Sequence, residues 1–431
     1  MAEDPGSSLS RRRFLAVSAG VGAGVASAVS GLGSVGTVLA AVAPASSGSG
    51  GPSDAAALAP GLVPFEGADQ GGILRPATSQ PATIVAAFDV TAADRDELVR
   101  LFAEITARSR ALATARPPDP LDPAFPPPES GILGSSIGPS DLTVTVSVGA
   151  SLFDERYSLA DRKPRQLTEM PVYVGDQLER GASHGDLLVQ VCATDELACI
   201  HAMRYLMAGT RALMALRWMI TGFQRSDVQP GEGRTSTRNL LGFKDGTANP
   251  TASELEAGRL LWVGDGDGEP AWATGGSYVV VRRIRMFVER WDRTALSEQE
   301  AVIGRTKRTG APIGSGREED VPDYAADPAG VGVPLDSHIR LANPRTAATE
   351  RNRILRRGYS YNGGFDPAGQ LDQGLLFVAY QRDLEAGFVT VQQRLIGEPL
   401  AEYIRTEGGG FFFTLPGVTS RDGILGGALL A

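Results

Sequence analysis

The sequence predicts an α+β protein in which the element order β-α-β-β-α-β occurs twice, each time with an antiparallel sheet. Apolar runs of strand length alternate with stretches whose apolar residues have helical spacing, and the second half repeats the order of the first. This order is that of the ferredoxin-like unit. The chain has 431 residues, of which 42% are hydrophobic and 21% charged, so it can build two sizeable cores and is not globally disordered.

The first half opens with a predicted strand over residues 83–90 (TIVAAFDV). A helix follows, in which four apolar residues share one face: Leu98, Leu101, Phe102 and Ile105. After a proline-rich loop, residues 142–148 (LTVTVSV) alternate strictly, which predicts a half-buried strand. The remaining strand, helix and strand of this half are predicted over residues 186–191, 195–213 and 218–223.

The second half repeats the order less regularly. Its strands are predicted over residues 278–286, 354–361, 375–380 and 411–415, and its helices over residues 296–303 and 384–396. Alternation on the second of these strands sends Arg356 and Arg357 to opposite faces. One of the two must point inward, where it needs an anion or a polar cofactor as its partner. A cofactor between a sheet and a helical layer would meet this need.

The N-terminal segment is typical of an export signal. Residues 10–15 (SRRRFL) match the twin-arginine type and precede a long uncharged stretch rich in Ala, Gly and Ser. A transmembrane anchor is the alternative, but Gly and Ser dilute the stretch too much to favour it. We therefore predict no membrane span after processing. The expected organisation is a signal peptide, a flexible linker and two ferredoxin-like domains, over residues 1–43, 44–60, 61–225 and 226–431.

Composition narrows the function classes. Lys plus Arg number 41 and Asp plus Glu number 50, a formal net charge of −9 that argues against nucleic-acid binding. Cys192 and Cys199 cannot form a disulfide framework or an all-cysteine metal site, and we expect buried free thiols. The chain has three histidines, His184, His201 and His338, so an imidazole-based site uses very few of them.

Three segments contain the candidate chemistry. The first is GFKDGTANP at residues 242–250, where glycines on both sides of an acidic residue allow the backbone to approach a ligand closely. A surface Asp-Gly turn is the alternative for this segment taken alone. The second is DSHIRLANPR at residues 336–345, whose lone histidine has a structural role as its alternative. The third is the arginine pair of the strand over residues 354–361.

Together these segments resemble the dye-decolorizing peroxidase family. Residues 242–246 match the family's Gly-x-x-Asp-Gly signature, and His338 and Arg356 follow it in the expected order. The resemblance extends from residues 63–67 (VPFEG) to residues 415–417 (LPG), nearly the whole chain after the linker. The segments SHGDLLVQVCA, GLLFVAYQRDLEAGF and GGGFFFTLPGV make the chain most similar to the exported deferrochelatase/peroxidase branch of bacterial iron-uptake operons.

The resemblance implies one non-covalent haem b per chain, held mainly by the C-terminal domain. His338 would be the axial ligand of the haem iron, and Asp245 and Arg356 would be the catalytic residues on the opposite, distal face. Asp383 is our expected partner for the second ring nitrogen of His338. Further haem contacts implied by the family are Gly246, Thr247, Ala248, Asn343, Pro344, Arg345 and Arg356 itself.

The function that the resemblance implies is a peroxidase that uses hydrogen peroxide to oxidise dyes, phenols or ferrous iron through an oxyferryl intermediate. One alternative is a deferrochelatase, which releases iron from haem and leaves the tetrapyrrole intact. Another is a haem carrier without catalysis, which Asp245 and Arg356 disfavour because storage needs no distal proton shuttle. The expected partners are peroxide, a reducing substrate, components of an iron-uptake system and further copies of the chain. The expected location is the periplasm, the cell envelope or the extracellular space.

Overall fold

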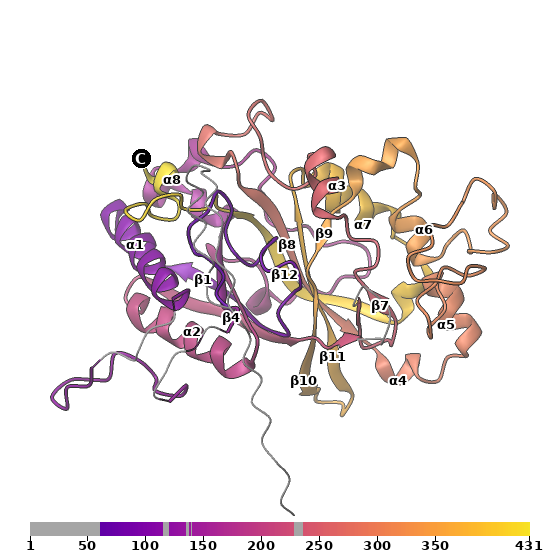
Figure 1. Cartoon of the computed structure of the whole chain (residues 1–431), viewed down its shortest axis with the longest axis horizontal. Coiled ribbons are helices and arrows are strands. Elements are labelled where there is room, and N and C mark those ends of the chain that lie inside the picture. The colour runs from indigo at the N-terminus through magenta and orange to yellow at the C-terminus, as the bar shows by residue number, and fades with distance from the viewer. Residues whose placement is uncertain (1–60, 115–119, 135–137, 139, 228–235) are drawn as a thin grey trace, which may run out of the picture. The chain divides into compact units, whose positions relative to one another are not determined.

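Two four-stranded units form the centre of the protein. The computed structural model describes residues 61–114, 120–134, 138, 140–227 and 236–431 (Figure 1), so the predicted signal and linker lie outside the described residues. The first unit has the spatial order β4-β1-β3-β2, with β1 Ala82–Val90, β2 Thr143–Gly149, β3 Leu187–Ala193 and β4 Met214–Phe223. The second has the order β12-β8-β11-β10, with β8 Ser277–Met286, β10 Tyr359–Phe365, β11 Leu371–Gln381 and β12 Ile404–Thr414.

The two units share one nine-stranded sheet. β12 pairs with β2 from Phe412↔Gly149 to Thr414↔Ser147, and β10 pairs with β4 at Ser360↔Phe223, so the sheet closes on itself. The short strand β9 (Leu355–Arg356) adds to β11. The pairings within this sheet are antiparallel, which confirms the predicted α+β fold with two ferredoxin-like units. Their predicted bounds, 61–225 and 226–431, stay a prediction.

The first unit carries the two long helices, and the other helices are short (Figure 1). The long helices α1 (Arg95–Leu112) and α2 (Glu196–Thr210) belong to the first unit, and Asp94 and Asp195 cap their N-termini. The face of α1 predicted to be apolar is buried. The remaining helices are short: α3 Ala252–Ala257, α4 Val288–Trp291, α5 Leu296–Ile303, α6 His338–Ala342, α7 Thr390–Arg394 and α8 Gly427–Leu430. Three short strands form a separate sheet: β5 Ser226–Asp227, β6 Ser236–Arg238 and β7 Lys244–Asp245.

The strand predicted to be half-buried is buried on both faces. All seven residues of β2 are shielded from solvent, so this prediction was wrong. The polar side chains find partners on the covered face: Gln80 Nε2 donates to Thr143 Oγ1 at 3.0 Å, and Thr145 Oγ1 donates to the carbonyl of Gly71 at 2.6 Å. Alternation therefore marks polar residues correctly here, but these residues meet buried hydrogen-bonding groups instead of water.

Two predicted elements of the second half are broken. The strand expected over residues 354–361 splits into β9 and β10, and the helix expected over residues 384–396 consists of a π-helical turn, Glu385–Val389, followed by α7. Arg356 and Arg357 have different partners, Asp245 and backbone carbonyls, and Arg357 lies between the two strands. The buried one, Arg357, donates to carbonyl oxygens, including Ile73 O at 3.0 Å, so the anion or cofactor expected for it was wrong.

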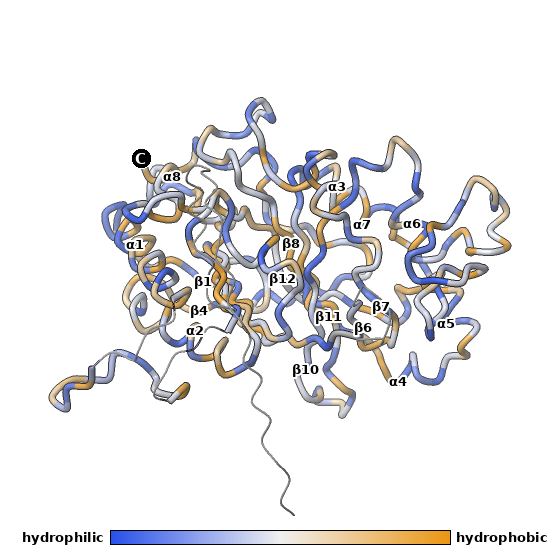
Figure 2. Tube along the Cα trace, viewed as in Figure 1, coloured by the Kyte–Doolittle hydropathy of each residue, from blue (hydrophilic) through white to orange (hydrophobic). Residues whose placement is uncertain are grey.

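The central strand β1 of the first unit is strongly hydrophobic and stands out in Figure 2. Every residue of β1 except one is buried. Cys192 on β3 and Cys199 on α2 are buried and free, as predicted. The core of the first unit is therefore apolar.

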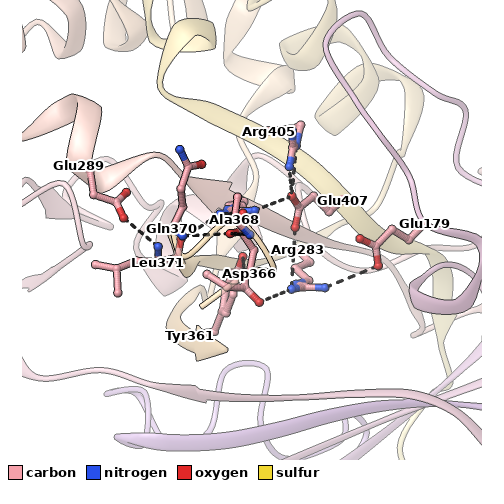
Figure 3. A network of polar contacts seen from close by, with 12 residues as sticks. Glu179, Arg283, Glu289, Tyr361, Asp366, Ala368, Gln370, Leu371, Arg405 and Glu407 are labelled. Atoms are coloured by element: carbon pink, nitrogen blue, oxygen red, sulfur yellow. Dashed lines mark hydrogen bonds and ion pairs between the residues drawn. The ribbon is translucent and has the colours of Figure 1, made fainter. Parts of the chain in front are cut away.

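A polar network ties β8, β11 and β12 together (Figure 3). Glu407 on β12 accepts a hydrogen bond from Arg405 at 2.6 Å and lies 3.8 Å from Arg283 Nη2 and 3.9 Å from Arg285 Nη1. Arg283 also pairs with Asp372 at 2.7 Å. Only 6% of the Glu407 side chain is exposed, so three arginines share one buried carboxylate.

We expect Glu407→Ala to lower the free energy of unfolding by about 2 kcal/mol, because it removes the hydrogen bonds of Arg405 to a buried carboxylate, while Arg283 and Arg285 keep Asp372 and Asp366 as partners. Urea denaturation measures the change. Arg100→Ala is the control: Arg100 is 59% exposed and pairs with Glu97 on the surface of α1, so the cost stays below about 1 kcal/mol. Equal losses in the two variants would contradict the structural role of Glu407.

Candidate functional site

A cavity of about 300 Å³ opens in the second unit. Strands β8, β11 and β12 form one wall and helices α6 and α7 another, and the GFKDGT segment borders it. The walls carry apolar side chains such as Ile284, Leu375, Phe377, Ile339, Val391 and Leu395. A mostly apolar cavity with a few polar groups is typical of a site for a small molecule or cofactor.

The first half of the chain also reaches this cavity. Val174, Gly175 and Asp176 line it. Asp176 forms a buried ion pair with Arg282 of β8, whose Nη1 also donates to Gln392 Oε1 at 2.7 Å. Burial raises the pKa of the Asp176 carboxyl and lowers the pKa of the Arg282 guanidinium, although each group partly offsets this effect on the other. The cavity therefore belongs mainly, but not wholly, to the second unit.

His338 lies at the start of α6 and lines the cavity. Its Nδ1 is 2.7 Å from Oε2 of Glu398, a buried carboxylate. Burial opposes protonation of the imidazole, but the attraction and hydrogen bond of Glu398 outweigh it, so the pKa of His338 is raised. Within the described part of the chain, Nε2 has no hydrogen-bond partner. A carboxylate that holds the proton on Nδ1 leaves Nε2 as the lone-pair donor for a metal.

The expected partner Asp383 was wrong. Asp383 Oδ1 accepts a hydrogen bond from the backbone N–H of Ala386 at 2.8 Å and so stabilises the start of the π-helical turn. Glu398, fifteen residues further on, takes its place beside His338. Only the position of Glu398 in a Gly-Glu-Pro turn distinguishes it in sequence, and this pattern carries no chemical indication.

The predicted catalytic pair is in direct contact. Arg356 Nη1 on β9 donates to Asp245 Oδ1 on β7 at 2.8 Å, and both side chains line the cavity that His338 lines. His338, Asp245 and Arg356 thus border one cavity, although they come from three separate segments. The structure therefore brings together all three residues that the sequence indicated.

The side chain of Asn249 joins the segment of Asp245 to the backbone of Arg356. Asn249 Nδ2 donates to the carbonyl of Arg356 at 2.7 Å, and Asn249 Oδ1 accepts from its N–H at 3.1 Å. Gly242 and Gly246 adopt left-handed backbone conformations, with φ values of 85° and 92°, which favour glycine. Asn249 lies within the GFKDGTANP segment but is not among the site residues predicted from sequence.

A second residue that sequence reasoning missed is Glu318. It accepts hydrogen bonds from Lys244 Nζ at 2.6 Å, from Thr247 Oγ1 at 2.7 Å and from Ser236. Burial opposes ionisation of Glu318, but these three hydrogen bonds outweigh it and hold its pKa below the usual value. Nothing in the surrounding sequence, GSGREED, separates Glu318 from its acidic neighbours.

The other predicted contacts mostly reach the cavity. Its lining includes Gly246, Thr247, Ala248, Asn343 and Arg345, but not Pro344. Arg345 has a left-handed backbone with φ of 57°, and its Nε is buried with no hydrogen-bond partner among the described residues. A buried donor of this kind suits a negatively charged group of a ligand.

These residues fit haem. The cavity offers an apolar wall for a flat macrocycle, an imidazole nitrogen for the iron and Arg345 for a carboxylate side group. Across the described ranges, no group of three or more His, Cys, Asp or Glu residues is arranged to hold a metal ion. His338 is thus suited to be the protein ligand of an iron whose other ligands come from a porphyrin.

Known proteins resemble the chain over nearly its full described length. Residues 70–224 match the model of the Dyp-type peroxidase N-terminal domain, and residues 236–419 match that of the C-terminal domain. The deferrochelatase of Escherichia coli O157:H7 is 50% identical over 369 residues, which cover 85% of this chain and 87% of that protein. The deferrochelatase of Yersinia pseudotuberculosis serotype I is 50% identical over 368 residues, or 85% and 84% of the two chains.

Solved structures agree in fold. A DyP-type peroxidase from Streptomyces coelicolor superposes with a TM-score of 0.77 and 36% identity, covering 86% of this chain and 97% of that one. Ferric DtpA from Streptomyces lividans gives a TM-score of 0.77 and 36% identity over 86% and 97% of the two chains.

Proposed function

The chain belongs to the Dyp-type peroxidase family and is a haem-dependent peroxidase, and we propose that His338, Asp245 and Arg356 carry out its chemistry. The observation that supports this assignment is their convergence on one cavity from three separate segments, with Arg356 and Asp245 in contact at 2.8 Å. Gly246, Thr247, Ala248, Asn343 and Arg345 would contact the haem through the cavity lining.

The proximal side holds and orients the cofactor. His338 Nε2 would bind the iron, while Glu398 keeps the imidazole in one tautomer and one orientation. Arg345 would pair with a propionate through its unsatisfied donor. When bound, the haem would supply the redox centre that gives two electrons to hydrogen peroxide.

The distal residues handle the proton. Asp245 Oδ1 accepts a hydrogen bond from Arg356, so Oδ2 is the oxygen that would accept a proton from hydrogen peroxide. Asp245 would take this proton from one peroxide oxygen and return it to the other oxygen, which departs as water. The remaining N–H groups of Arg356 can donate to the leaving oxygen and stabilise its developing charge. Arg356 thus acts through its charge and its hydrogen bonds, and Asp245 carries the proton.

Deferrochelatase activity is the second candidate, because relatives at 50% identity carry that name. The two functions differ in the fate of the haem iron, which a peroxidase keeps and a deferrochelatase releases. The test incubates haem-loaded protein with and without peroxide in the presence of a phenol or dye. We expect peroxide-dependent oxidation of the dye with no fluorescence of metal-free porphyrin. Porphyrin fluorescence without dye oxidation would establish the second function instead.

We further propose that the protein is exported folded and haem-loaded by the twin-arginine route, that it works with components of an iron-uptake system, and that it self-associates. The leader lies outside the described residues. Among the helices that the structure describes, none combines the length and hydropathy of a membrane span.

We expect Arg11→Lys combined with Arg12→Lys to retain active enzyme in the cytoplasm, because the twin-arginine pair is the recognised feature of the leader. Cell fractionation followed by a peroxidase assay measures the distribution. The change Arg13→Lys, next to the pair, serves as the control. Undiminished export of the double variant would contradict this route.

A further inference from the structure

We propose that Glu318 is a positioning residue for the reaction with peroxide, because it anchors the segment that carries Asp245 on both sides of that residue. The inference rests on the proposed role of Asp245. Glu318 itself does not belong to the cavity lining, so it acts through its neighbours and not through contact with a ligand.

The contacts of Glu318 surround Asp245 along the chain. Lys244 immediately precedes Asp245, and its Nζ donates to Glu318 Oε2 at 2.6 Å. Thr247 follows two residues after Asp245, and its Oγ1 donates to Glu318 Oε1 at 2.7 Å. Ser236, on the strand that pairs with β7, donates to the same oxygen. One buried carboxylate therefore fixes the segment before and after the catalytic residue.

The backbone alone is too weak to hold Asp245. β7 comprises two residues, and its ladder to β6 consists of the pairs Thr237↔Asp245 and Arg238↔Lys244. A small isolated sheet is marginally stable in water, and Gly242 and Gly246 beside β7 add conformational freedom. Side-chain anchors are needed to keep the Asp245 carboxylate within reach of its partner.

Charge supports the same assignment. Lys244 and Glu318 have side chains that are each 3% exposed, so the ammonium group is neutralised where it is buried. Lys244 therefore pairs with Glu318 and does not compete with Arg356 for the adjacent Asp245 carboxylate. Arg305 in turn fixes the backbone of Glu318, since its Nη1 donates to the Glu318 carbonyl at 2.9 Å. Glu318 is therefore held in place through its backbone as well as through its carboxylate.

The first test is Glu318→Gln in the haem-loaded protein. We expect the bimolecular rate of reaction with peroxide to fall roughly 10- to 100-fold, because a small displacement of a catalytic group has effects of this size. Haem content and the resting spectrum should stay normal. Amides of residues 242–250 should exchange hydrogen faster. The matched control is Asp372→Asn, which breaks the ion pair with Arg283 away from this cavity and should leave the peroxide rate unchanged.

A double variant separates positioning from stability. Lys244→Met with Glu318→Leu replaces the buried pair by apolar groups of similar size, which commonly restores stability. We expect the urea midpoint of unfolding of the double variant to be closer to that of the wild type than the midpoint of Glu318→Gln. The rate of reaction with peroxide should stay low, because the hydrogen bond from Thr247 is still missing. Recovery of the rate together with stability would overturn the inference and assign Glu318 a purely structural role.

A parallel measurement on Asp245→Asn distinguishes the two levels of the proposal. If Asp245→Asn slows the peroxide reaction and Glu318→Gln does not, the positioning role is wrong and the proposed function stands. If Asp245→Asn has no effect, the role of Asp245 is wrong, whatever Glu318→Gln does.

Discussion

His338→Ala is expected to lose most of the bound haem, or to retain haem with a strongly shifted Soret band. His338 lines the cavity and Glu398 lies 2.7 Å from its Nδ1, so its removal deletes the proposed axial nitrogen and leaves the Glu398 carboxylate buried without this partner. Peroxidase activity should fall to background. The haem-to-protein absorbance ratio of purified protein and its visible spectrum measure the effect.

His201→Ala is the control for this variant. His201 is a buried histidine within α2, and its Nδ1 lies 3.0 Å from Ser130 Oγ, so its loss costs packing in the first unit but should leave the haem spectrum close to normal. Glu398→Gln is an intermediate case: it keeps a hydrogen-bonding group beside Nδ1 but removes the charge, so haem should bind with an altered spectrum. A normal spectrum and full activity in His338→Ala would contradict the assignment.

Asp245→Asn should slow the reaction with hydrogen peroxide by roughly 10²–10⁴-fold, the usual contribution of general acid–base catalysis. The amide keeps the size of the side chain and can still meet Arg356, but it cannot accept the proton of peroxide. Haem binding should be preserved because Asp245 is not the axial ligand. Stopped-flow recording of the haem absorbance after mixing with peroxide gives the rate constant.

Arg356→Leu is the companion variant and should cost roughly 10²–10³-fold, as expected for one preorganised donor. The two losses should not add, because both groups serve one transition state and hold each other at 2.8 Å. Arg357→Leu controls for the loss of the neighbouring arginine, whose Nη1 donates to the Ile73 carbonyl at 3.0 Å: it should lower stability and spare the peroxide rate. If Asp245→Asn reacts at the wild-type rate, Arg356 is the main distal catalyst and Asp245 only orients water.

Much of the fold follows from local patterns. The apolar spacing of Leu98, Leu101, Phe102 and Ile105 places them on the buried face of α1, since the period of a helix depends only on neighbouring residues. Alternation in residues 142–148 correctly predicts β2, but not its burial. Burial depends on what covers the second face, and that cover comes from residues around Gly71 and Gln80, far away in the chain.

The candidate site divides in the same way. The GFKDGTANP, DSHIRLANPR and ILRRGYSY segments are recognisable in sequence because glycine, histidine and arginine stand at fixed offsets within each of them. Their convergence is supplied by the paired strands: β9 adds to β11, which pairs with β8, and Asn249 joins Arg356 to the Asp245 segment. Family resemblance anticipated this convergence, whereas the spacing of the segments alone does not.

The sequence by itself thus determined the element order, the buried face of α1 and the three chemical segments with His338, Asp245 and Arg356. Only the tertiary structure decided the partners of these residues: Glu398 beside His338 instead of Asp383, and Glu318 behind Asp245. The physical reason is that periodicity and motifs are properties of neighbouring residues. A buried carboxylate is selected by the groups that a closed sheet and its loops bring within hydrogen-bond distance, and no local pattern encodes that encounter.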